Sequence, residues 1–221
     1  LVIGNAGITP DMARAQMTIW SIWSAPLIMS NDLRNIAPVF RDILLNRRVI
    51  AIDQDPLGRM GRLVANTSDV GVYTKSMMPF DSRTGDFTFA IGVLNRNTAN
   101  RNSVEFVLSR LGLNSPGGYR LEDVWSGQLL GIFRPSDSFQ SIVNPTSANL
   151  YKATPVHLAR NDGLQFTSFR TQAGGRTSSA NPRAVTVRPL SFPRAFSRAR
   201  GFRRGFRRNA RRFHARGQKK Q

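Results

Sequence analysis

Two aspartates near residue 55 have the spacing of a catalytic carboxylate pair. Asp53 and Asp55 are separated by one residue, so on a β-strand both side chains would point to the same face. Two carboxylates about 5 Å apart can act as nucleophile and acid–base in double displacement at the anomeric carbon of a sugar. The run Asp55-Pro56-Leu57-Gly58 is also a favourable turn sequence, because Pro suits the second position of a turn. We favour the turn.

Asp32 is a second acidic candidate. It follows the apolar run Ala25–Ser30, which we predict to be a buried strand. At the carboxyl end of a barrel strand, Asp32 could bind a sugar or transfer a proton. Asn31-Asp32 could equally close a turn before Leu33, as short polar residues after strands usually do. We favour the turn and keep Asp32 as the one candidate substrate-binding residue.

The sequence contains few residues of the types that bind metals or form disulfides. His157 and His214 are the only two histidines, and there is no cysteine. A zinc site needs about three or four clustered ligands. We therefore predict no metal site, no cofactor, no disulfide scaffold and no Ser-His-Asp triad.

Three tryptophans could stack on sugars. Trp20 and Trp23 lie three residues apart in a predicted helix, which favours packing, for Trp23 at least. Trp125 lies in a predicted strand, and we expect it in the core.

One glycosylation sequon is present. Asn66-Thr67-Ser68 is the only N-x-[ST] triplet without a central Pro, since Asn144-Pro145-Thr146 fails that requirement. We predict that Asn66 lies in an exposed turn and carries a glycan.

The first sixty residues alternate between strand and helix patterns. Leu1–Asn5 and Ala25–Ser30 predict buried parallel strands, a helix is expected from Pro10 to Ser24, and another starts near Pro38. This alternation is typical of parallel α/β architecture. Two strands cannot complete such a sheet, so we interpret Leu1 as lying inside a longer protein.

After Gly61 the pattern changes to short strands between turns. The spacing predicts an antiparallel β-sandwich over residues 61–158. The expected strands cover 71–74, 87–94, 104–108, 119–125, 138–143 and 148–153.

The last segment, residues 159–221, is strongly basic. The whole chain of 221 residues has a net charge of +19, and residues 161–221 contain sixteen Lys and Arg but one acid, Asp162. This composition predicts disorder. Phe residues between the arginines suit nucleic acid or an anionic membrane, and an unselected extension is equally open. The candidate polyanion-binding residues are Arg203, Arg204, Arg207, Arg208, Arg211 and Arg212.

No apolar run has the length of a membrane span, so no transmembrane segment is predicted.

Three runs in the front segment carry a family resemblance: LVIGNAG at 1–7, WSIWSAPLIMSNDLR at 20–34 and VIAIDQDPLG at 49–58. They resemble lysosomal α-galactosidase and α-N-acetylgalactosaminidase. Weaker matches follow in VWSG at 124–127 and IVNPT at 142–146, whereas the basic segment has no counterpart in that family.

The resemblance implies a (β/α)8 barrel followed by an antiparallel β domain. Residues 1–60 would be the last two βα units, with Leu1–Asn5 as the seventh strand and Pro26–Ser30 as the eighth. Both catalytic aspartates of the family lie upstream of the segment that matches Leu1, so no catalytic residue is assigned here. The resemblance further implies terminal α-galactosyl or α-N-acetylgalactosaminyl glycoconjugates as substrates, a homodimer, and a lysosomal or secreted location.

Overall fold

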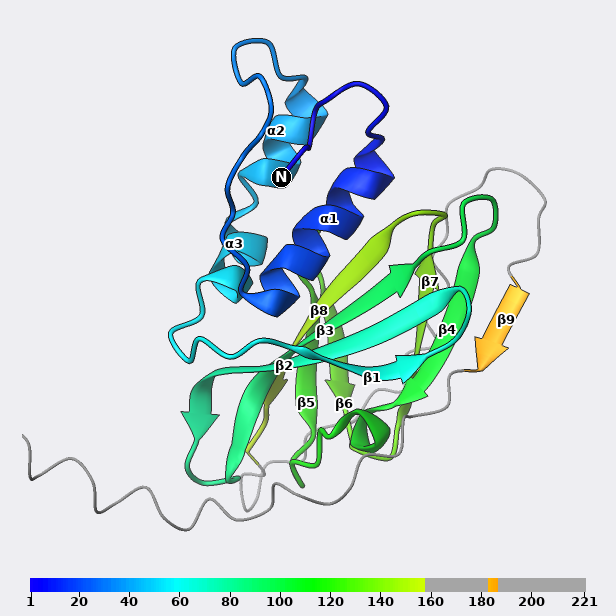
Figure 1. Cartoon of the computed structure of the whole chain (residues 1–221). Helices are drawn as coiled ribbons and strands as arrows, with labels where there is room; N and C mark the ends of the chain where they lie inside the picture. The colour runs from blue at the N-terminus through cyan, green and yellow to red at the C-terminus, as the bar shows by residue number, and fades with distance from the viewer. Residues whose placement is uncertain (158–182, 187–221) are drawn as a thin grey trace, which may run out of the picture. The chain divides into compact units, whose positions relative to one another are not determined.

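The computed structural model describes residues 1–157 and 183–186. A layer of helices covers one face of a six-stranded sheet, and a smaller sheet covers the other face (Figure 1). The helices and both sheets belong to one compact unit. None of the helices in the described residues is both long and apolar enough to cross a membrane. The helices are α1 Pro10–Trp23, α2 Pro38–Leu44 and α3 Arg47–Asp53.

Helix α1 begins at Pro10, as its N-terminal signals predict, and ends at Trp23, one residue before the predicted end. The Thr9 side chain accepts a hydrogen bond from Met12 N at 3.2 Å, and Pro10 occupies the first helical position. Ser24 ends the helix in the left-handed conformation, with φ 50° and ψ 39°. One face of α1, including Met17 and Ile22, is buried against the sheet and the other helices.

The two predicted front strands are not strands in the structure. Leu1–Asn5 and Ala25–Ser30 are extended or turn segments. They lie side by side, because the Leu1 amine donates to Ile28 O and Ser30 N donates to Leu1 O at 2.8 Å. That pattern is the start of a parallel ladder. The ladder does not continue beyond these two bonds, because the side-chain amides of Asn31 and Asn5 donate to Ile3 O and Ser30 O in place of backbone N–H groups.

The predicted sandwich is confirmed. The larger sheet has the strand order β1-β2-β3-β8-β5-β6, and the smaller has the order β7-β4-β9. The sequence patterns missed β1 and β6 and placed the end of β5 two residues too late. The strands are β1 Arg62–Asn66, β2 Val70–Asp81, β3 Asp86–Asn95, β4 Asn102–Val107, β5 Tyr119–Asp123, β6 Leu129–Phe133, β7 Ser138–Val143, β8 Ala148–Pro155 and β9 Arg183–Thr186.

The larger sheet contributes to two separate cores. Alternate residues of β3 illustrate this, because Ile91 and Val93 pack toward the smaller sheet while Ala90 packs toward the helices. The core between the sheets contains no residue from the helical layer. The other core joins α1, α2 and α3 to the outer face of the larger sheet.

Strand β9 corrects one part of the disorder prediction. Arg183–Thr186 pairs in parallel with Asn102–Glu105 of β4, so these four residues are ordered. The segment includes β-branched Val185 and Thr186, which favour strands, and β4 has an edge free to receive it. The rest of the basic segment lies outside the described residues.

Candidate functional site

A buried lysine occupies the junction between the helices and the larger sheet. Lys75 of β2 is only 1% exposed. Its Nζ donates to Ser21 O at 3.0 Å, to Ser24 Oγ at 2.7 Å and to Ile52 O. All three donors of the ammonium group are therefore used.

The three acceptors of Lys75 lie at the C-terminal ends of α1 and α3. These ends carry partial negative charge, and neither helix has a basic residue in its own last turn. Lys75 supplies that cation from the sheet to both helices at once. The sequence offers no signal for this role, since an isolated lysine in a strand is usually a solvent-facing residue.

Both candidate aspartates, Asp53 and Asp55, are buried near this lysine. Burial lowers the pKa of Lys75, and the charges of Asp55 and Asp53 oppose that shift. Burial raises the pKa of Asp53, against the hydrogen bond from Gln54 and the charge of Lys75. Asp53 Oδ1 is buried without a hydrogen-bond partner. The carboxylates thus take part in a charge cluster inside the protein.

The turn interpretation holds for Asp55. Gly58 N donates to Asp55 O at 2.9 Å, which closes the turn, and Leu57 N donates to Asp55 Oδ1 at 3.1 Å. Asp55 Oδ2 accepts from Met78 N at 2.9 Å. Asp53 ends α3, so the two carboxylates do not share a strand face. Both Asp55 oxygens are occupied by backbone donors and are not free to attack a sugar.

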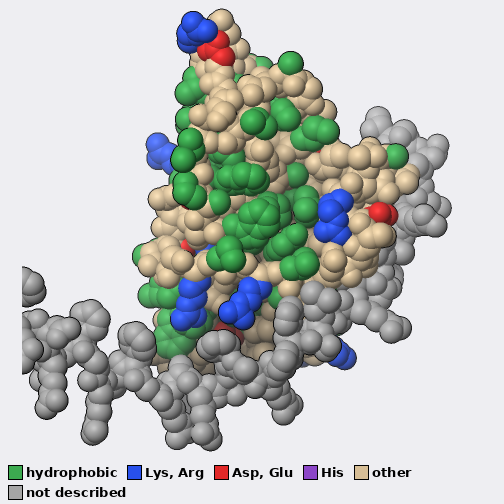
Figure 2. All heavy atoms as spheres, viewed as in Figure 1, with side chains coloured by type: hydrophobic (Ala, Val, Ile, Leu, Met, Phe, Trp, Pro, Cys, Tyr) green, Lys and Arg blue, Asp and Glu red, His purple; other side chains and the backbone are tan. Residues whose placement is uncertain are grey.

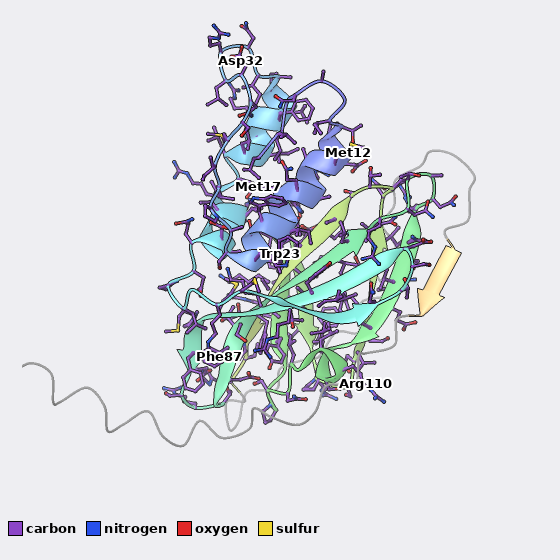
Figure 3. All side chains as sticks on the ribbon, viewed as in Figure 1. Met12, Met17, Trp23, Asp32, Phe87 and Arg110 are labelled. Carbon is purple, nitrogen blue, oxygen red and sulfur yellow. The ribbon has the colours of Figure 1, made fainter. Side chains whose placement is uncertain are left out.

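Asp32 lies far from this cluster, on the loop between α1 and α2 (Figure 3). Its carboxylate accepts from Arg34 N at 3.0 Å, and Arg34 Nη2 pairs with Asp32 Oδ2 at 2.7 Å. The hydrogen bonds from Arg34 hold the pKa of Asp32 below its ordinary value. These contacts are those of a turn, and a sugar-binding role for Asp32 stays a prediction.

The tryptophans pack only in part as predicted, since Trp20 and Trp125 pack against the helical core and Trp23 stays largely exposed. Trp20 is half-buried against the helical core, whereas Trp23 is 39% exposed. Trp23 lies at the C-terminal end of α1, where its ring is 6.5 Å from that of Tyr73 on β2 (Figure 3). A helical spacing of three residues places both rings toward one side but does not decide which one is covered. Figure 2 shows hydrophobic side chains gathered over α1 and the adjoining strands.

Trp125 lies in a turn after β5 and not in a strand. Asp123 Oδ1 accepts from Trp125 N at 2.8 Å, which bends the chain out of the sheet. The ring is half-buried, and the Arg14 guanidinium lies 5.8 Å from its centroid.

The remaining candidates are separate from one another. His157 Nε2 pairs with Asp81 Oδ2 at 2.9 Å, and His214 lies outside the described residues. Among residues 1–157, no three His, Cys, Asp or Glu side chains group as a metal site. Asn66 is exposed, and its Oδ1 accepts from Arg96 Nη2 at 2.7 Å. The six candidate arginines from Arg203 to Arg212 lie outside the part of the chain that the structure describes.

Comparison with known proteins resolves the architecture. Residues 1–55 match the family model described as alpha galactosidase A, and residues 68–153 match the alpha galactosidase C-terminal beta sandwich domain. The chain belongs to the α-galactosidase/α-N-acetylgalactosaminidase family of glycoside hydrolases. Within this family it covers the end of the catalytic domain and the sandwich that follows.

Individual relatives agree with this family assignment. The chain is 35% identical over 165 residues to alpha-N-acetylgalactosaminidase of Gallus gallus, covering 72% of this chain and 38% of the relative. It is 30% identical over 154 residues to human alpha-galactosidase A, covering 68% of this chain and 34% of the relative. The fold is similar to alpha-galactosidase I from Mortierella vinacea, with a TM-score of 0.61 at 22% identity over 69% of this chain and 38% of that one. The chain thus spans little more than a third of the relatives' length.

Proposed function

We propose that this chain is the C-terminal part of a retaining glycoside hydrolase. The enzyme would remove terminal α-linked galactose or N-acetylgalactosamine from glycolipids and glycoproteins. The observation that carries the proposal is the order of the two family matches, because the end of the catalytic domain is followed directly by the C-terminal sandwich. Two relatives similar to it in sequence bear the names of these two activities.

The contribution of this segment would be to close the barrel and to support it on the sandwich. The beginning of a parallel ladder between Leu1 and Ile28–Ser30 suits the last two strands of a barrel. Several apolar side chains of the first 60 residues are open to solvent, including Ile28 at 72%, Leu33 at 51% and Leu45 at 64% exposure. Such residues fit a surface that the remainder of a barrel would cover.

We further propose that the 221 residues alone do not hydrolyse glycosides. By family resemblance, the nucleophile and the acid–base both precede the segment that matches Leu1. Two acidic candidates of this chain are otherwise engaged, because Asp32 pairs with Arg34 and both Asp55 oxygens accept backbone hydrogen bonds. Asp53 is buried at the end of α3.

A chimera tests this proposal. The first part of the Gallus gallus relative would be joined to residues 1–157 of this chain in place of its own matching segment. We expect the chimera to hydrolyse 4-nitrophenyl α-galactoside or α-N-acetylgalactosaminide, and the isolated chain to give no turnover. Turnover by the isolated chain that is lost in Asp32→Asn or Asp53→Asn would overturn the proposal. So would a folded chimera without activity, with folding judged by circular dichroism against the unmodified relative.

Asn66 supports a lysosomal or secreted location for the enzyme. Its side chain is exposed where β1 meets the turn into β2, and Ser68 of the sequon is exposed as well. Arg96 holds Oδ1, which leaves the amide nitrogen as the atom for a glycan. After expression behind a secretion signal, we expect a mass decrease on treatment with peptide N-glycosidase, absent in both Asn66→Gln and Ser68→Ala. An unchanged mass in the wild type would contradict the proposal. From the family resemblance we also propose that the full-length enzyme is a homodimer, to be checked by its mass in solution.

Polyanion binding through the basic segment is the second candidate. The observation that favours it is compositional, namely sixteen basic residues against one acid in residues 161–221. Binding of single-stranded RNA to the full chain should weaken steeply with salt. The variant with Arg203, Arg204, Arg207, Arg208, Arg211 and Arg212 changed to Gln should lose most of that affinity. Affinity unchanged in this variant, or insensitive to salt, would exclude the segment as the binding site.

A further inference from the structure

A cavity of about 330 Å³ opens between α3 and the strands β2, β5 and β8. It lies at the lower end of the range of about 300–1,000 Å³ that is usual for small-molecule sites. Its charged lining residues are Arg47, Arg48, Asp55, Glu122 and Lys152. Solvent reaches it, since the side chains of Arg48 and Glu122 are 52% and 34% exposed.

The two carboxylates of this cavity are already engaged. Asp55 accepts from Leu57 N and Met78 N, one backbone donor for each oxygen. Glu122 Oε1 lies 3.9 Å from Arg48 Nε, and Glu122 faces Lys152 across the antiparallel pair of β5 and β8. The cavity is therefore lined by three cations, Arg47, Arg48 and Lys152, and by only two carboxylates. Because both carboxylates already have partners, the cavity keeps an excess of positive charge.

Two of the three cations have no partner of their own. Within the described part of the chain, neither Arg47 nor Lys152 has an ion pair within 4.0 Å or a side-chain hydrogen bond. Both are carried by regular elements, Arg47 by the first turn of α3 and Lys152 by β8. Asn46 fixes the start of α3, since its Oδ1 accepts from Arg48 N at 3.1 Å and from Val49 N at 3.3 Å. The cations are thus held at the rim of one cavity by rigid backbone.

We propose that this cavity binds a small oxyanion, a phosphate or phosphate monoester, between Arg47, Arg48 and Lys152. Guanidinium groups present paired donors that match the oxygens of phosphate, and a lysine adds a point charge. Apolar lining from Ile52, Met77 and Val124 would accommodate the carbon skeleton of a monoester such as a hexose phosphate.

The test is a titration of the full chain with inorganic phosphate, followed through backbone amide NMR shifts at constant ionic strength. Shifts of the amides of Arg48, Val124 and Lys152 report on the cavity separately from the basic segment. We expect saturable shifts in the wild type, with a half-saturation concentration raised about tenfold in Arg47→Gln/Lys152→Gln, where two charge-assisted contacts are lost. The control Arg110→Gln/Arg120→Gln changes two exposed arginines outside the cavity and should leave the titration unchanged.

A second titration with a hexose phosphate identifies the source of the anion. Tighter saturation by the hexose phosphate than by phosphate assigns the site to a phosphate monoester, and equal saturation assigns it to free phosphate. The proposal is overturned if sodium chloride produces the same shifts, if the shifts do not saturate, or if the cavity variant and the control respond alike. Unchanged amide spectra of β4 and β7, which lie outside the cavity, confirm that the variants are folded.

Discussion

The sandwich and the helical layer satisfy their buried groups in different ways. In the sandwich, β3 pairs with β2 on one side and β8 on the other, and the core between the sheets is built from sandwich residues alone. In the helical layer, the last carbonyls of α1 and α3 depend on Lys75 of β2. The apolar faces of these helices also pack on the larger sheet. The helices therefore need the sandwich, whereas the sandwich has a core that does not need the helices.

Replacing Lys75 should lower the free energy of unfolding more than any other change predicted here, because both helices depend on its hydrogen bonds. In Lys75→Met, Ser21 O, Ile52 O and Ser24 Oγ lose their donor inside the protein. We expect a loss of about 3 kcal/mol in the free energy of unfolding, because buried acceptors without partners are costly. Hydrogen exchange should show the loss of protection in α1 and α3 before β3 and β8. The exposed Arg120→Met serves as the control, and equal loss in both layers would contradict the asymmetry.

Adding a side chain at Gly61 should push the helical layer away from the sandwich, because Ile22 of α1 lies directly against this glycine. A Cβ on Gly61 would lie 2.5 Å from Ile22 Cγ2 and 2.9 Å from Ile22 O. Gly61→Ala should therefore cost about 2 kcal/mol in urea unfolding, as overpacking does. In Gly92→Ala the new Cβ lies 3.1 Å from Ile22 Cγ1, which can adjust, so we expect a smaller loss. A Gly92 effect equal to or larger than that of Gly61 would show that Ile22 is not held as described.

A change inside the sandwich should leave the helices attached. Tyr151 is buried, and its hydroxyl lies 2.7 Å from Ser141 Oγ and accepts from Asn149 Nδ2 at 3.0 Å. Tyr151→Phe should lower the free energy of unfolding by about 1 kcal/mol. Urea unfolding measured alongside hydrogen exchange should show that α1 and β3 lose protection together. A selective loss in α1 would contradict this expectation.

The same tyrosine also predicts a dependence on alkaline pH. Burial raises the pKa of Tyr151 to about 12, above the ordinary value of about 10 in the unfolded chain. Its stabilising effect is full below pH 10 and falls as the pH rises toward 12, because the unfolded state loses the proton first. Tyr151→Phe should flatten part of that slope in urea midpoints measured between about pH 9 and 12.

Neutralising Asp53 should give a small effect of the opposite sign. Burial raises the pKa of Asp53, so its contribution is favourable at acidic pH and is lost as the pH rises through the folded-state pKa. Asp53→Asn should raise the free energy of unfolding by roughly 1 kcal/mol at pH 7, with no gain at pH 3.5. Thermal unfolding at several pH values measures this. A loss at pH 7 would mean that the attraction between Asp53 and Lys75 outweighs the burial of the carboxylate.

The sequence was most informative where structure depends on local signals. Thr9-Pro10-Asp11 correctly predicts the start of α1, and the alternation in Ser138–Val143 correctly predicts β7. Leu1–Asn5 and Ala25–Ser30 read as buried strands because they are apolar, but a strand is completed by hydrogen bonds from neighbours. An apolar pattern alone could not show that the ladder between these two segments stops after two hydrogen bonds.

The candidate site was less predictable than the fold. The turn at Asp55 follows from its own four residues, and the structure contains it. The role of Lys75 could not be predicted, because its acceptors Ser21, Ser24 and Ile52 are distant in sequence. Ser21 and Ser24 precede it by 54 and 51 positions, and Ile52 precedes it by 23. Trp125 was misplaced for a related reason, because the Asp123 side chain ends β5 by bonding to the following backbone.

Strand β9 has a consequence for how molecules of this protein behave toward one another. It covers Asn102–Glu105 of β4, so the smaller sheet ends in a strand of four residues in place of one of six. A short terminal strand offers a poor template for a strand from another molecule. The segment thus contributes to solubility, by limiting the edge through which two sandwiches could aggregate.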